Sequence, residues 1–171
     1  MISRIRSLIK NAPTERIPVQ LNDVVTEIAD LAAHQASNGG VSMKTDLEPN
    51  LPQVLGDKIQ FQQVILNLIT NGLEATSDVN GRPRRLEIHT QMRGPDQVQV
   101  SVSDTGVGVA QELSPRLFEP FFTTRSQGIG MGLPTSRSII EAHGGRLWAE
   151  SSLGQGSVFQ FTVPHSASLS V

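Results

Sequence analysis

The sequence contains no cysteine, no long apolar run and no excess of positive charge. Without cysteine the chain can form neither disulfides nor thiolate metal sites. A net charge of -2 gives no electrostatic reason to expect nucleic acid, because proteins that bind it concentrate positive charge on one face. The run at residues 64–66 ends at Asn67, far short of the roughly 20 residues that a membrane span needs. We expect a cytoplasmic segment that contacts neither nucleic acid nor membrane.

At 171 residues, of which 37% are hydrophobic and 18% charged, the chain suits one compact domain with short tails. Its first residues place Ile2, Ile5 and Leu8 at helical spacing, and this amphipathic pattern differs from the continuous apolar core of a signal peptide. We expect a short helix within residues 1–13, the domain at 14–164 and a loose tail at 165–171.

Helical and strand patterns alternate along the chain without internal repeats. Residues 105–131 are rich in glycine, proline, serine and threonine, which is typical of a long binding loop or of disorder. The mixture predicts a two-layer α/β sandwich, in which about three helices cover one face of a mixed, mostly antiparallel sheet. The predicted helices are 22–37, 58–76 and 134–143, and the predicted strands are 41–47, 85–93, 97–104, 146–151 and 157–163.

The helix predicted at 58–76 has an apolar face and a narrow polar stripe that holds Asn67, Asn71 and Glu74. Such a stripe is ordinarily a solvated face. Solvated faces favour glutamate and lysine, however, and asparagine is a poor helix former. The amide oxygens of Asn67 and Asn71 could instead complete the shell of Mg²⁺, which prefers oxygen ligands. Both interpretations remain open at this point.

Asp104 ends a strand in which Val98, Val100 and Val102 point to one face. Period 2 puts the Asp104 carboxylate on that same buried face, where it needs hydrogen-bond donors. It could cap its own turn at residues 105–106, as is common at strand ends. It could also accept a hydrogen bond from a ligand amine, such as the exocyclic amine of adenine.

Glycines follow Asp104, and others precede the last predicted helix. This arrangement suggests a phosphate-binding site. Glycine lets the backbone approach a ligand closely, and a helix N-terminus offers free N–H groups to an anion. Neither a Walker loop nor the dinucleotide fingerprint is present. Each cluster alone is more often a turn. The glycines are Gly106, Gly108, Gly128, Gly130 and Gly132.

Five short segments resemble, in order, the N, G1, F, G2 and last glycine boxes of sensor histidine kinases. The resemblance covers roughly residues 21–164 and implies the Bergerat ATP-binding fold. The segments are 67–75 (NLITNGLEA), 104–108 (DTGVG), 117–124 (LFEPFFTT), 128–133 (GIGMGL, running on to the HGG of 143–145) and 154–157 (GQGS).

By this resemblance, Asn71 with Asn67 would hold Mg²⁺ on the phosphates of ATP, and Asp104 would bind the adenine amine. Asn71, Asn67 and Arg125 are the expected catalytic residues, and Gly106 and Gly108 would flank the base. The glycines before the last helix would form the phosphate end of a mobile lid that phenylalanines 118, 121 and 122 fasten to the core. The remaining expected nucleotide contacts are Phe122, Thr123, Thr124, Gly128, Gly130, Met131, Gly132, Leu133 and Ser157.

Some positions depart from the family pattern. Arg125 stands where a lysine is common, which keeps the charge but changes its geometry. Gly72 replaces the usual alanine, at a cost of about 0.5–1 kcal/mol in a helix interior. Ser157 stands where threonine is frequent, and Pro134 follows the G2 leucine. None of these changes removes a group that the chemistry needs.

The family transfers phosphate to a histidine that is typically followed by an acidic residue, and His34, His89, His143 and His165 do not fit. His143 ends a predicted helix, where a cation is favoured by the helix dipole. We expect the acceptor on a dimerisation domain outside this sequence, with residues 1–13 as that domain's last turns. A response regulator is the further partner that the resemblance implies.

Two other functions remain compatible with the sequence. One is a stand-alone ATPase or a serine kinase on the same fold, such as the anti-sigma-factor kinases. Hydrolytic relatives place a glutamate where Asn67 stands, which argues against an ATPase. The other is a non-catalytic module whose interactions are gated by nucleotide.

Overall fold

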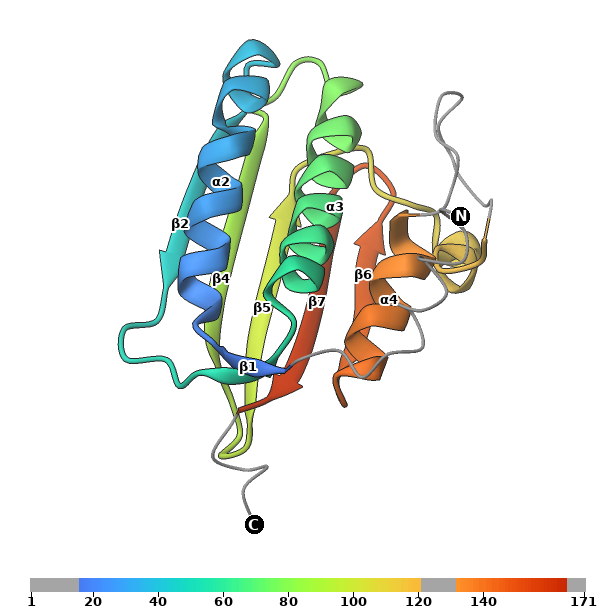
Figure 1. Cartoon of the computed structure of the whole chain (residues 1–171). Coiled ribbons are helices and arrows are strands. Elements are labelled where there is room, and N and C mark those ends of the chain that lie inside the picture. Colours follow the sequence, from blue (N-terminus) through green and yellow to red (C-terminus); the bar gives the residue numbers. More distant parts are fainter. Residues whose placement is uncertain (1–15, 121–131, 166–171) are drawn as a thin grey trace, which may run out of the picture.

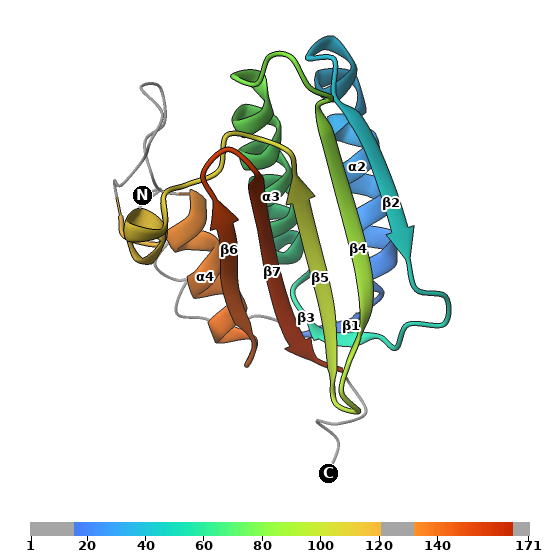
Figure 2. The same ribbon diagram turned by 180° about the vertical axis from the view of Figure 1, so that it is seen from behind.

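The structure is a computed structural model that describes residues 16–120 and 132–165. Three helices cover one face of a five-stranded sheet, and in the described part no helix covers the other face (Figures 1 and 2). The predicted two-layer α/β sandwich is therefore confirmed. The helices are α2 (Leu21–Asn38), α3 (Lys58–Ser77) and α4 (Gly132–Ala142), and the sheet contains β2 (Ser42–Leu47), β4 (Arg85–Arg93), β5 (Gln97–Asp104), β6 (Arg146–Ser152) and β7 (Gly156–Pro164).

The sheet has the strand order β2-β4-β5-β7-β6. β2 and β4 run parallel, because the chain between them passes through α3, and the other neighbours are antiparallel. The predicted turns join β4 to β5 and β6 to β7. Gly94 and Gly154 adopt positive φ angles of 65° and 81° in these turns. The mixed, mostly antiparallel sheet follows from this connectivity.

The start of α3 and the end of α2 coincide with capping residues. The Asp57 side chain caps α3 by accepting from the N–H groups of Ile59 and Gln60, and Gly39 ends α2. The predicted apolar face of α3 is buried against the sheet, as are the alternating valines of β5. Gln99 alternates with these valines and lies on the outer face. It is nevertheless buried there, and it forms hydrogen bonds with Arg93 and Gln160.

Three short elements were not predicted: β1 (Ile17–Val19), β3 (Val54–Gly56) and the 3₁₀ helix η1 (Gln111–Arg116). β1 and β3 pair antiparallel beneath the start of α2 (Figure 1). Three-residue strands beside prolines carry too little periodicity to be recognised. His165, the first residue of the expected tail, bridges to Val54, and residues 166–171 and 1–15 lie outside the described part. No helix of the described part is both long and apolar enough to cross a membrane.

His143 does not act as the cation that its position after a helix suggests. It is buried, its Nδ1 bonds the Ile139 carbonyl at 2.8 Å, and its Nε2 accepts from the Asp57 N–H at 3.1 Å. Burial lowers the pKa of His143 below its ordinary 6.5. The neutral ring therefore joins the end of α4 to the N-cap of α3, packed against Phe61 at 4.5 Å between ring centroids.

We expect His143→Leu to lower the free energy of unfolding by about 1–3 kcal/mol at neutral pH, because the Asp57 N–H loses its acceptor. As pH falls below 6.5, the unfolded chain takes up a proton before His143 in the folded protein, so the wild type loses this stabilisation. His143→Gln, which keeps an acceptor that does not titrate there, should lose less stability on acidification. Urea unfolding at about pH 7.5 and about pH 5 measures the difference, and equal losses would contradict it.

Candidate functional site

The members of the predicted site that the structure describes lie where α3 meets the end of β5 and the start of α4. Gly72, on α3, lies over Asp104: a Cβ added to it would be 3.7 Å from Asp104 Oδ2. Gly106 packs on the last turns of α3, and the Val107 N–H bonds the Ala75 carbonyl at 3.3 Å. Segments 67–75 and 104–108, which resemble the N and G1 boxes, are thus packed against each other.

Asp104 is 5% exposed, and burial raises its pKa to about 6. Hydrogen bonds from the N–H groups of Gly106 and Ser157, together with the charge of Arg82, act in the opposite direction without offsetting it. The Gly106 N–H donates to Oδ1 at 2.8 Å, so the carboxylate does cap its own turn. Because these donors leave desolvation uncompensated, the carboxylate can also accept a hydrogen bond from a ligand.

The glycines after Asp104 are required by close packing. Gly108 has a φ of 71°, and a Cβ there would overlap the Ser152 carbonyl of the β6–β7 turn. A Cβ on Gly106 would lie 2.6 Å from the Cβ of Ala75. The turn is therefore held between α3 and the last glycine box. Packing explains both glycines without a ligand, so their expected contact with the base stays a prediction.

Two further residues hold this turn, and sequence reasoning missed both. Arg82, in the loop after α3, donates to the Gly106 carbonyl at 2.7 Å. Ser151 accepts from the Val109 N–H at 2.8 Å and bonds the hydroxyl of Ser157 at 2.7 Å. Ser157 is itself buried and lies directly across from Asp104 on β7. Neither Arg82 nor Ser151 belongs to a local pattern that would have revealed its contact.

Asn67 and Asn71 are half-buried on α3 and not part of a freely solvated face. The amide nitrogen of Asn67 donates to the Ser136 hydroxyl at 3.0 Å and to the Gly132 carbonyl at 3.3 Å, which ties α3 to the start of α4. Among the described residues, the amide oxygens of both asparagines accept no hydrogen bond, so they remain available as oxygen ligands.

The rest of the predicted site is described only in part. Gly132 and Leu133 begin α4, two residues before the predicted start at Pro134. Phe118 packs against the core, with the guanidinium carbon of Arg137 5.1 Å from its ring centroid, and its expected role in fastening a lid stays a prediction. The other expected residues lie outside the described part, and they are Phe121, Phe122, Thr123, Thr124, Arg125, Gly128, Gly130 and Met131.

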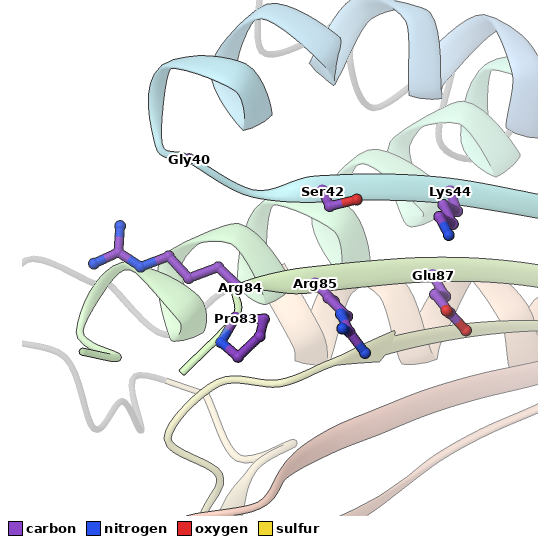
Figure 3. A pocket seen from close by; sticks show the side chains of 7 residues that line it. All are labelled: Gly40, Ser42, Lys44, Pro83, Arg84, Arg85 and Glu87. Atoms are coloured by element: carbon purple, nitrogen blue, oxygen red, sulfur yellow. The ribbon is translucent and has the colours of Figure 1, made fainter. Parts of the chain in front are cut away.

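A hollow elsewhere on the molecule contains none of the predicted site residues. Figure 3 shows Lys44 of β2 and Arg85 and Glu87 of β4 projecting from the sheet away from the helices. Asp104 pairs with Leu86, and both side chains lie on the buried face of the sheet, opposite to the face that carries the hollow. Arg84, at one end of the hollow, donates to the Val79 and Gly39 carbonyls, which gives it a structural role. The hollow is therefore a solvated part of the outer face.

Residues 56–167 match the family described as histidine kinase-, DNA gyrase B-, and HSP90-like ATPase. The sensor protein FixL of Bradyrhizobium diazoefficiens is 40% identical over 164 residues, which are 96% of this chain and 32% of FixL. The chain thus spans about a third of the length of this relative.

Solved structures agree with this match. The nucleotide-free catalytic domain of the histidine kinase ThkA superposes with a TM-score of 0.77 at 31% identity, over 89% of this chain and 99% of that one. ThkA in complex with the response regulator TrrA gives 0.74 at 27% identity, over 98% and 49%. The chain therefore belongs to the histidine kinase-, DNA gyrase B- and HSP90-like ATPase family. Within that family it is an ATP-binding catalytic domain of the sensor histidine kinase type.

If the Asp104 carboxylate binds the nucleotide as an acceptor, ATP affinity should fall as pH drops through about 6, where the carboxyl takes up a proton. Titration of Asp104 does not itself destabilise the fold over this range, because its raised pKa means that the folded chain takes up the proton first as pH falls from about 6 to 3.8. Unfolding measured at the same pH values separates the fall in affinity from the stability lost at His143.

Asp104→Asn, which cannot titrate, is the matched control. Titration calorimetry at several pH values between about 5 and 8 should give a steeper pH dependence for the wild type than for the variant. Parallel profiles would show that another group, or the nucleotide itself, causes the change.

Proposed function

We propose that this domain binds Mg-ATP and donates the γ-phosphoryl group to a histidine on a separate dimerisation domain. The observation that carries the proposal is the convergence of a buried, donor-poor carboxylate, Asp104, with the two asparagines of α3 beside the start of α4. The family match supports ATP as the nucleotide. The amphipathic pattern of residues 1–13, which we expect to be the last turns of a dimerisation helix, is consistent with it.

In this proposal each described residue has a distinct role. The Asp104 carboxylate accepts from the exocyclic amine of adenine and disfavours guanine, whose oxygen at that position is also an acceptor. Arg82 and the Gly106 N–H hold the turn that carries Asp104. Asn67 and Ser136 fix the start of α4, where N–H groups face the phosphates. The domain thus supplies positioning and charge neutralisation, which dominate phosphoryl transfer.

The residues present fit a magnesium ion. Mg²⁺ prefers oxygen ligands and keeps several waters, so one or two amide oxygens beside the phosphates suffice. Asn71 and Asn67 are the residues that would hold it, and Mg²⁺ would neutralise charge on the phosphates. No cluster of three or more His, Cys, Asp or Glu suited to a metal occurs in the described ranges, so the ion depends on the nucleotide as well.

The expected partners are a histidine-bearing domain and a response regulator. His143 is buried and used in the fold, and none of the other three histidines has the sequence context of an acceptor. The γ-phosphorus would form a bond to Nε2 of the partner histidine as its bond to the β-γ bridging oxygen breaks, releasing ADP. The solved complex of ThkA with TrrA supports a response regulator as the later recipient.

Two alternatives rest on the same nucleotide site. A hydrolytic ATPase would need a water-activating carboxylate, and Asn67 instead donates to Ser136 and Gly132. A non-catalytic module would bind nucleotide without passing phosphate on. The presence or absence of transfer to a histidine domain separates these alternatives from the proposal.

The decisive experiment incubates the chain and γ-labelled ATP with the matching histidine-bearing domain. We expect acid-labile, base-stable label on that domain, as phosphohistidine requires. The same domain with its acceptor histidine replaced by alanine is the control. Nucleotide binding without transfer to a competent partner would favour the gated module, and rapid release of inorganic phosphate would favour the ATPase.

Asn71→Ala should weaken Mg-ATP binding about tenfold or more, because contacts with charged groups contribute roughly 1.5–3 kcal/mol. It should change binding of the nucleotide in excess chelator much less. Asn38→Ala, exposed at the end of α2, is the matched control. Titration calorimetry with and without Mg²⁺ measures both, and an equal loss in the two conditions would remove Asn71 from the metal site.

A further inference from the structure

Gly72 faces the strand pair that carries Asp104 and is packed closely against it. A Cβ added to it would overlap Cδ1 of Leu86 and would lie 3.5 Å from the Cβ of Asp104. Leu86 lies on β4 directly across from Asp104 on β5, so the two side chains are immediate neighbours on the buried face. Gly72 is therefore in contact distance of both members of this cross-strand pair.

The atom that a Cβ on Gly72 would overlap is at the end of the Leu86 side chain, and burial limits how far this side chain can turn aside. Leu86 is fully buried in the core, and side chains in a close-packed core move only by displacing their neighbours. A methyl group at position 72 would therefore push Leu86 toward Asp104 or move α3 away from the sheet. Either response changes the distance between α3, which carries Asn71, and the Asp104 carboxylate.

We propose that Gly72 is a positioning residue that sets the spacing between the metal end and the base end of the nucleotide site. The inference rests on the proposed function, in which Asn71 serves the phosphates and Asp104 the adenine amine. Asn71 immediately precedes Gly72, so the helix–sheet contact at Gly72 fixes both groups at once. Glycine weakens the helix interior, and at this position it allows Leu86 to fill the space beside Asp104.

Because alanine is usual at this position in the family, the positioning role belongs to the contact of Gly72 with Leu86 in this chain. Helix propensity and positioning then predict opposite results for Gly72→Ala. Alanine is the better helix former, so propensity alone would leave binding unchanged and stability equal or higher. Positioning predicts about tenfold weaker ATP binding, through loss of a charge-assisted contact. It also predicts loss of the preference for ATP over purine riboside triphosphate, which lacks the exocyclic amine.

Leu86→Val offers a volume-conserving rescue. It removes the δ-carbons that a residue-72 methyl group would overlap, and the double variant Gly72→Ala/Leu86→Val moves one methylene from one side of the contact to the other. We expect the double variant to regain most of the affinity and the preference for ATP. Gly39→Ala, where the new Cβ would meet no atom nearer than 3.5 Å, is the matched control and should bind as the wild type does.

The test measures dissociation constants of both nucleotides, with Mg²⁺, for the wild type and the four variants, after thermal unfolding shows which are folded. A folded Gly72→Ala that retains the wild-type preference, or a double variant that does not regain it, overturns the inference alone. A Gly72→Ala variant that cannot fold also overturns the inference, because Gly72 would then be required for folding and not for positioning the site. A wild type that binds both nucleotides equally overturns recognition of the amine by Asp104, and the inference with it.

Discussion

The burial of the Asp104 carboxylate is the constraint on which the rest of the candidate site depends. An aspartate at the end of a core strand loses hydration that its backbone donors only partly replace, as its raised pKa indicates. The fold tolerates this cost by bringing N–H donors from its own turn and from β7 across the sheet, and the Arg82 loop adds a nearby positive charge and holds the turn through the Gly106 carbonyl. In the proposed function, the acceptor capacity that remains on this carboxylate serves the ligand amine.

Close packing around that carboxylate then fixes the neighbouring elements. Gly106 must fit against Ala75, Gly108 against the β6–β7 turn and Gly72 against Leu86. Each of these contacts leaves no room for a Cβ, so α3, the turn after β5 and the β6–β7 turn have little freedom relative to one another. Gly106 and Gly108, which the sequence assigns to the approach of a ligand, are therefore also required by packing within the protein, whereas a Cβ on Gly132 would make only ordinary contacts with Asn67.

The sequence predicted what depends on local periodicity. The face of α3 and the alternation of β5 were both predicted, because each pattern repeats within a few residues. Contacts between distant segments could not be predicted. Arg82 reaches Gly106 across 24 positions, and Asn67 bonds Ser136 across 69 positions. The resemblance located the N box, but it could not show that the Asn67 amide nitrogen donates hydrogen bonds to the start of α4.

The same limit explains the error over His143. A histidine after a helix suggests a cation, yet burial against Phe61 and an N–H donor from Asp57 make the neutral ring the stable form. This bond holds the end of α4 to the beginning of α3, while the Asn67 amide holds the beginning of α4 to the middle of α3. Two polar contacts, one at each end of α4, thus fix this helix along α3. The position of Gly132, next to the expected phosphate site, is set by contacts that involve no ligand.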